Sequence, residues 1–395
     1  FILASLNPAV VLKRGLAGKG SHSWMRSLLV TFQFVVSITL MIGTMVVYGQ
    51  LDFIQTKKLG FDREQVVVIK KTDDIGGQIA SFKQELLRYP GVSGVANSTD
   101  LMGDYFGDSL YRPMDNPGVE NQLIFRLWTD PDFAETYRME MAEGAYFSNE
   151  IPDERGQNVI LNETAVKTLG MQNPVGKRLV DMDENEFTVI GILKDFHWAS
   201  LHEPIKPLVI HGMPSPFGKY TSVRLATDDI REAMAVFENT WQQFAGAQAF
   251  EYEFFDDHFA EIYLAEEKTG RTFFVFSLFA IFIAGLGLFG LAAFITIQRT
   301  REIGVRKVLG ASAPAIVALL SKEFAILVGA ASVIAWPISY LVMDRWLQDF
   351  AYRVDIGFEI FPIAGVLALI LAWLPVSYHA IKAALANPVE TLRYE

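Results

Sequence analysis

The fold is decided by the stretch FFVFSLFAIFIAGLGLFGLAAFITIQ at 273–298, which is followed at 299–323 by RTREIGVRKVLGASAPAIVALLSKE. The first stretch carries no charge, and its length lets a helix cross a hydrocarbon core of about 30 Å. The second stretch opens with a basic cluster, namely Arg299, Arg301, Arg306 and Lys307. An apolar span that runs into a cationic segment is typical of a cytoplasmic exit from a membrane. We therefore predict a protein that acts across a bilayer.

The composition agrees with a membrane protein and argues against several function classes. The mean hydropathy is +0.24, and 51% of the residues are apolar. The sequence has no cysteine, which excludes disulfides and thiolate chemistry. A net charge of −11 argues against a nucleic-acid partner, because nucleic-acid binders carry a basic surface. The acidic excess falls within 52–272, whereas 1–27 and 299–323 are basic, and this asymmetry predicts the topology.

Three more apolar stretches predict membrane spans. LLVTFQFVVSITLMIGTMVVY at 28–48 has a basic N-terminal flank, which places the N-terminus inside; a signal anchor would share this pattern. Residues 324–343 cross outward, and Pro337 is expected to kink that helix. Residues 360–379 return inward, and small residues for close helix packing recur every fourth position at Ala364, Ala368 and Ala372.

The long acidic interval predicts a folded domain outside the membrane. Strand-like runs and helical periods alternate irregularly there, which favours an α+β fold with two subdomains. The expected strands are 65–70, 91–98, 122–129, 158–162, 186–196, 220–227 and 250–256, and the expected helices are 75–88, 132–139, 163–169, 229–244 and 257–269. Since no helix breaker precedes Phe273, we expect the last helix to continue into the membrane as one rigid rod.

The predicted fold class is therefore an α-helical four-span membrane bundle with a large α+β periplasmic domain inserted between the first and second spans. The expected segments are a cytoplasmic interfacial segment (1–27), span one (28–51), the periplasmic domain (52–272), span two (273–298), a cytoplasmic coupling segment (299–323), span three (324–343), a short periplasmic loop (344–359), span four (360–379) and a cytoplasmic tail (380–395). A flexible basic tail is the alternative for 1–27. The opening LNPAVVLKRG is similar to the closing ANPVETLRYE, so we interpret 1–15 as the tail of a preceding unit of the same kind.

Several motifs resemble known sites but lack the required context. Gly285, Gly287 and Gly290 form G-x-G-x-x-G, yet they lie in an apolar span without the strand and the later acid of a dinucleotide site, so close helix packing is the better account. The sets His197, Trp198, His202, Glu203 and Asp256, Asp257, His258 lack metal-site spacing, and we interpret them as a structural loop and a helix start. Asn162 fits a glycosylation acceptor, but a helix N-cap explains it as well. We find no catalytic constellation and predict no metal and no cofactor of the chain's own.

The segment RTREIGVRKVLGAS is the strongest functional candidate. On a helix, Ile303, Val305, Val308 and Leu309 would form an apolar side, and Arg301, Arg306 and Lys307 a cationic side. A basic stop-transfer flank is the alternative, but it would require neither the glycines nor the apolar side. We therefore predict that this short helix is a mechanical input to the span that precedes it. The predicted contact residues are Arg301, Glu302, Ile303, Gly304, Val305, Arg306, Lys307, Val308, Leu309 and Gly310.

At these residues the chain resembles the MacB/FtsX-type permeases of ABC transporters. The similar stretches include TREIGVRKVLGAS (300–312), WLQDFAYRVDI (346–356) and HAIKAALANPVETLRYE (379–395), and TVIGILKDFHWASLHEPIKPLVI (188–210) is similar to the family's periplasmic core domain. The resemblance implies a non-enzymatic permease in the bacterial inner membrane, with both termini cytoplasmic. It also implies a coupling helix near 301–310 that docks on a separate cytoplasmic ABC ATPase dimer, which would bind the ATP.

The expected function is the transmission of ATP-driven motion to the periplasmic domain for export or extraction of a substrate. A signalling device that regulates a periplasmic partner without transport is the alternative, and a membrane-anchored hydrolase is disfavoured because no catalytic site is found. The expected partners are the ATPase dimer, membrane lipid and a second permease unit, which is either the preceding half or another copy. Export would add a periplasmic adaptor.

Overall fold

The computed structural model describes residues 21–116, 118, 120–148, 156–213 and 218–385. The chain divides into two compact units. The helical unit holds the residues up to Gln55, Glu266–Asp349 and the residues from Arg353 onward. The α+β unit holds Thr56–Ala265 together with the tripeptide Phe350–Tyr352. The similar sequences at the two ends of the chain, and the interfacial segment up to residue 20, lie outside the described residues.

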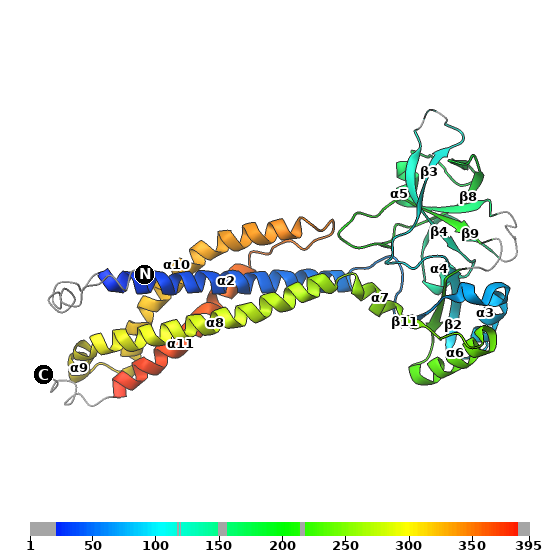
Figure 1. Ribbon diagram of the computed structural model, residues 1–395. Helices are drawn as coiled ribbons and strands as arrows, with labels where there is room; N and C mark the ends of the chain where they lie inside the picture. The colour runs from blue at the N-terminus through cyan, green and yellow to red at the C-terminus, as the bar shows by residue number, and fades with distance from the viewer. Residues whose placement is uncertain (1–20, 117, 119, 149–155, 214–217, 386–395) are drawn as a thin grey trace, which may run out of the picture. The chain divides into compact units, whose positions relative to one another are not determined.

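Four long helices form the helical unit (Figure 1), and they are α2 (Ser21–Thr56), α8 (Leu264–Gln298), α10 (Ala313–Leu347) and α11 (Ile360–Leu385). All four are long and apolar enough to cross a membrane, which confirms the prediction of four spans with a domain between the first and the second. The short helix α9 (Thr300–Val308) lies between α8 and α10.

Small and glycine residues let these helices approach closely. The predicted seam on α11 is buried in the core of the helical unit, where Ala364, Ala368 and Ala372 are at most 3% exposed. Gly287 on α8 faces α2, because a Cβ at this position would lie 2.5 Å from Oε1 of Gln33. The glycine pattern of α8 therefore serves close helix packing at Gly287. The prediction is wrong for Gly285 and Gly290, because a Cβ at either position would meet no described atom within 4 Å.

The α+β unit contains one sheet of 11 strands. The strands are β1 (Val66–Lys70), β2 (Val92–Ser98), β3 (Asp108–Pro113), β4 (Gln122–Thr129), β5 (Met141–Gly144), β6 (Asn158–Asn162), β7 (Arg178–Asp181), β8 (Glu186–Leu193), β9 (Leu208–Gly212), β10 (Tyr220–Leu225) and β11 (Tyr252–Phe254). The described helices of this unit are η2 (Thr72–Gln78), α3 (Ile79–Leu87), α4 (Phe133–Thr136), α5 (Glu163–Thr168), α6 (Ile230–Ala245) and α7 (Phe255–Glu261).

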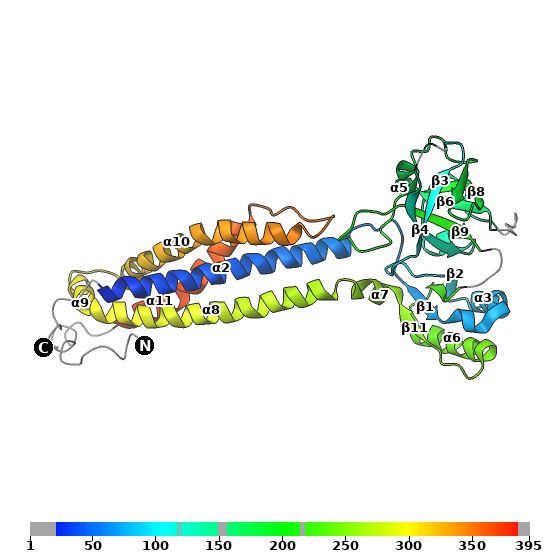
Figure 2. The same ribbon diagram turned by 45° about the horizontal axis from the view of Figure 1, so that its top comes forward.

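Among the described residues of this unit, two hydrophobic clusters lie against different parts of the sheet. Strands in the order β11-β1-β10-β2 pair antiparallel, and α3 and α6 pack on them around Phe82 and Trp241. The strands β4-β3-β7-β8-β6-β9 form a closed ring, because β9 also pairs with β4, and Leu161 and Val189 are buried in the second core. Figure 2 shows these two groups of strands. A single register pair, Ser98 with Thr129, joins β2 to β4.

The prediction of one unbroken rod from the α+β unit into the second span is wrong. Helix α7 ends at Glu261, a turn occupies Ile262 and Tyr263, and α8 begins at Leu264. The side chain of Tyr263 is buried, and its hydroxyl accepts a hydrogen bond from the amide of Leu201 at 2.8 Å. This tertiary contact coincides with the break, although the sequence contains no proline or glycine there.

Candidate functional site

The candidate site begins where α8 ends. Arg299 leaves helical geometry, with φ −100° and ψ 9°, and α9 starts at Thr300. The backbone remains hydrogen bonded across this joint, because the amide of Arg299 donates to Ile295 and the carbonyl of Arg299 accepts from Ile303. The guanidinium of Arg299 also forms an ion pair of 2.5 Å with Glu323 on α10. Both side chains are partly exposed, so this pair contributes at most about 1 kcal/mol.

Gly310 ends α9. Its φ of +92° is left-handed, a region that glycine adopts at little cost. The amide of Gly310 donates to Lys307 at 3.0 Å, and the amide of Ala311 donates to Arg306 at 2.9 Å. These two bonds form a Schellman motif, which satisfies carbonyl groups at the end of the helix. The chain then turns into α10, which has Pro314 in its first turn. The predicted short helix and its glycine stop are therefore present.

One side of α9 packs on the helical unit. Ile303 is 4% exposed and belongs to the apolar core that the four long helices share, and Gly304 beside it is buried. The helix contacts α11. Since burial of an isoleucine side chain contributes about 1.5–3 kcal/mol, Ile303 is an anchor for α9.

The opposite side of α9 exposes apolar and charged groups together. Val305, Val308 and Leu309 are 47%, 65% and 80% exposed. Arg306 is also exposed and pairs with Glu302 at 2.8 Å, one helical turn away. We call these five residues the outer face of α9. An exposed apolar stripe bordered by charge is typical of a surface that another protein covers.

The predicted division of this helix into an apolar and a cationic side is therefore wrong in one respect. Ile303 points into the core, whereas the other three apolar residues lie on the outer face with Arg306. Lys307 is half-buried rather than fully exposed. The side chain of Arg301 lies outside the described residues, although its backbone is helical. A sequence pattern cannot distinguish an apolar side chain in the chain's own core from one that awaits a partner.

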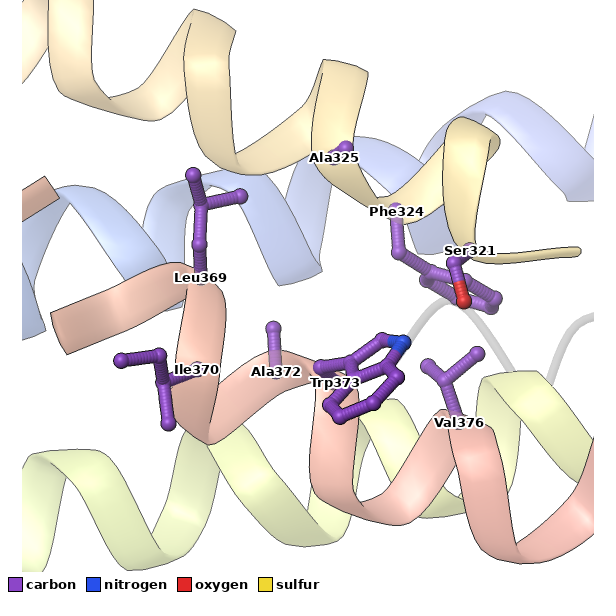
Figure 3. A pocket seen from close by; sticks show the side chains of 8 residues that line it. All are labelled: Ser321, Phe324, Ala325, Leu369, Ile370, Ala372, Trp373 and Val376. Atoms are coloured by element: carbon purple, nitrogen blue, oxygen red, sulfur yellow. The ribbon is translucent and has the colours of Figure 1, made fainter. Parts of the chain in front are cut away.

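A pocket of about 260 Å³ lies between α10 and α11, close to the start of α10 (Figure 3). Its lining is almost entirely apolar and consists of Ser321, Phe324, Ala325, Leu369, Ile370, Ala372, Trp373 and Val376. The hydroxyl of Ser321 has no hydrogen-bond partner among the described residues. The pocket can hold a hydrocarbon group, but it offers no charge for catalysis or for binding an ion.

The other motifs are structural where the chain is described. The side chain of Asn162 caps α5 by accepting from the amide of Ala165 at 2.9 Å. Asp256 and Asp257 lie in the first turn of α7, as expected of acids at a helix start. His197 and His202 pack against aromatic rings. No group of His, Asp or Glu that could hold a metal ion occurs within the described residues.

Two family models match this chain. The model described as FtsX-like permease C-terminal matches residues 274–388. The model described as MacB-like periplasmic core domain matches residues 28–239, which are more than half of the chain. Residues 240–273 lie between the two matches, and α8 begins within this interval.

A curated protein of this kind is also similar in sequence. The macrolide export ATP-binding/permease protein MacB of Bdellovibrio bacteriovorus is 24% identical over 273 residues, which are 64% of this chain and 41% of that protein. The chain thus matches less than half the length of this curated relative.

Solved structures of single domains are similar at lower identity. The periplasmic region of MacB from Actinobacillus actinomycetemcomitans has 15% identity, covers 51% of this chain and 94% of its own, and gives a TM-score of 0.37. The extracellular domain of the noncanonic ABC-type transporter YknZ from Gram-positive bacteria has 14% identity, covers 48% and 97%, and gives a TM-score of 0.35.

The match to the MacB-like domain covers most of the first span and continues through the α+β interval to residue 239, and the match to the FtsX-like permease contains most of the second span, α9 and the other two spans. This order agrees with the element order of the structure. The chain is a membrane protein that belongs to the MacB/FtsX-type permeases of ABC transporters.

Proposed function

We propose that this permease transmits ATP-driven movement of a separate ABC ATPase dimer to its α+β domain, for export or extraction of a substrate. The observation that carries the proposal is the outer face of α9. It combines exposed apolar groups with Arg306 on a helix that Ile303 anchors to the helical unit. The ATP would bind to the ATPase, and the permease itself would need no cofactor.

The proposal places α9 and both chain ends in the cytoplasm and the α+β domain in the periplasm. The basic residues that flank the spans support this orientation, because positive charge favours the cytoplasmic side. A second permease unit would complete the assembly. The name of the Bdellovibrio relative joins export, ATP binding and a permease, which favours transport over a purely regulatory role.

Reversing charge on α9 tests the proposal. We expect Arg306→Glu together with Lys307→Glu to abolish stimulation of the partner ATPase by the permease, since the contact would lose two positive charges and gain two negative ones. The measurement is the ATPase rate of the purified complex in lipid nanodiscs, compared with that of the ATPase alone.

The matched control carries the same charge change away from α9. Lys322→Glu together with Lys382→Glu alters two exposed bases on α10 and α11. This pair should leave stimulation within about twofold of the original, the range expected of surface changes outside a contact. If the α9 pair stimulates as well as the control pair does, α9 is not the coupling element.

A further inference from the structure

The segment Phe196–His202, which follows β8, contacts residues that lie within a few positions of each place where the chain passes between the two units. These passages lie at Gln55–Thr56, at Ala265–Glu266 and on either side of Phe350–Tyr352. The segment and all of the residues that it contacts below belong to the α+β unit. Its sequence, FHWASLH, was interpreted above as a structural loop.

The first contact is with the residues that follow α2. The amide of His197 donates to the carbonyl of Leu59 at 2.7 Å, and the ring of Phe196 meets Phe61 edge-on with ring centres 6.3 Å apart. Gly60 lies between these two partners with φ +90°, and a Cβ there would approach the Cβ of Phe196 to 2.7 Å. This close approach requires glycine, so the contact is built into the backbone.

The second contact is with the residues that precede α8. The amide of Leu201 donates to the hydroxyl of Tyr263 at 2.8 Å. Tyr263 lies in the turn between α7 and α8 and is 6% exposed. The ring of His202 stacks over the same tyrosine, with ring centres 6.5 Å apart.

The third contact is with the tripeptide Phe350–Tyr352, from the connection between α10 and α11. Two backbone hydrogen bonds hold it, from the amide of Ala351 to the carbonyl of His202 at 3.1 Å and from the amide of Tyr352 to the carbonyl of Leu201 at 3.2 Å. Phe350 is 4% exposed and stacks on His202, with ring centres 4.0 Å apart.

Tyr352 completes this third contact. Its ring meets His197 edge-on with ring centres 4.5 Å apart, and the ammonium group of Lys57 lies 4.7 Å from the centre of the same ring. The three residues thus form two aromatic contacts, a cation–π contact and two hydrogen bonds. This set of contacts indicates a specific attachment rather than a chance approach of a loop.

We propose that Phe350–Tyr352 is an internal docking peptide, and that Phe196–His202 is the receptor that joins it to the other two passages of the chain. The α+β domain is then attached to the helical unit at three places rather than at the two ends of an inserted domain. Movement of α10 and α11 reaches the domain through this peptide, in addition to movement of α2 and α8. The docking itself is independent of the proposed function, whereas its use in transmitting movement rests on it.

The connection leaves little free chain beside the docked peptide. The amide of Val354 donates at 2.9 Å to Oε1 of Gln50 on α2, and Gln50 is fully buried. Only Arg353 lies between Tyr352 and Val354, and consecutive Cα atoms are about 3.8 Å apart. A short connecting segment that is bound at both ends can transmit a displacement, whereas a long flexible loop cannot.

A disulfide tests the docking directly, because the natural chain has no cysteine. In the full-length permease in membranes, His202→Cys with Phe350→Cys should cross-link on mild oxidation. The yield should exceed that of a control pair about tenfold, because docking holds the two thiols at a high effective concentration. The control pair is Phe350→Cys with Asp183→Cys, in the exposed turn between β7 and β8. Equal yields for the two pairs, with each single cysteine reactive to maleimide, would overturn the proposal.

A second measurement keeps the rings of His202 and Phe350 in place. Hydrogen exchange of the amides of residues 351 and 352 should be about tenfold faster in the Tyr352→Ala chain, because these two amides donate the docking hydrogen bonds to the carbonyls of His202 and Leu201. Phe358→Ala is the control, since Phe358 lies in the same connection but packs on Trp336 and Phe361 of the helical unit. Unchanged exchange in the Tyr352→Ala chain would also overturn the proposal. Neither the cross-linking yield nor the hydrogen exchange requires the ATPase. Both therefore test the docking even if the proposed coupling through α9 is wrong.

Discussion

Two connections between long helices differ in how far their apolar side chains are exposed. Between α8 and α10, the short helix α9 is followed by its C-cap residue Leu309, which is 80% exposed. Between α10 and α11, an irregular segment places Phe350 at 4% exposure, within the α+β unit. The apolar side chains of the second connection pack within the chain itself, whereas the first connection presents apolar surface that none of the described residues covers. The exposed fraction of Leu309 and of Phe350 is therefore the clearest difference between the two connections.

The largest expected effect contrasts these two residues. Phe350→Ala should lower the free energy of unfolding of the α+β unit by about 3–5 kcal/mol, because it removes a buried aromatic ring. Leu309→Ala should change the stability of the chain by no more than about 0.5 kcal/mol, since its side chain is exposed. Thermal unfolding of the full chain in detergent, followed by tryptophan fluorescence, measures both. Equal losses in the two variants would remove the distinction between the connections.

A smaller effect is expected at the end of α9. Gly310→Ala should destabilise the Schellman motif by about 1–2 kcal/mol, because alanine resists a left-handed backbone. Gly310→Asn should recover part of this loss, because asparagine tolerates that conformation better. Hydrogen exchange of the amides in 300–311 reports the stability of the helix end. If alanine and asparagine behave alike, the left-handed geometry does not hold α9 in place.

The smallest expected effect appears in acid and concerns the receptor segment. Burial, with a further contribution from Lys57, lowers the pKa of His197 to about 4. The unfolded chain has the ordinary value of about 6.5, so it binds more protons between these two values. The stabilisation from a neutral His197 is therefore present above pH about 6.5 and is lost as the pH falls toward about 4. Melting temperatures measured across this range should fall less steeply in the His197→Gln chain.

His258 provides a control of opposite sign. Burial acts to lower its pKa, but Asp104 and Glu253 outweigh burial and raise the pKa above its ordinary value. Its contribution is present below the unfolded pKa and is lost as the pH rises through the folded pKa. His258→Gln should therefore reduce stability mainly at the acidic end. A His197→Gln chain with an unaltered acid profile would show that the contact with Tyr352 does not depend on the charge of the imidazole.

Much of the architecture could be predicted from local pattern. The four spans, the short helix α9 and the seam at Ala364 follow from apolar length, glycine position and helical spacing. The N-cap at Asn162 follows from residue type alone. The strands β3, β5, β7 and β9 were not predicted. β5 and β7 have only four residues each, and β9 is buried throughout, so it lacks the alternation that identifies a strand.

The remaining features depend on contacts between distant parts of the sequence. The break before α8 coincides with the bond from Leu201 to Tyr263, and the docked tripeptide lies about 150 positions from its receptor. Ile303 and Leu309 are both apolar, and only the packed structure separates the anchor from the outer face. Local periodicity contains none of this information, because it records spacing along one element only.

The contact of Gly287 with Gln33 limits the ways in which α2 and α8 can move. The carbonyl oxygen of Gln33 occupies the space that any larger residue at 287 would fill. A slide of one helical turn, about 5.4 Å, would bring Ile283 or Leu291 to the same place. Such a slide would therefore require the flexible end of the Gln33 side chain to move away from this position.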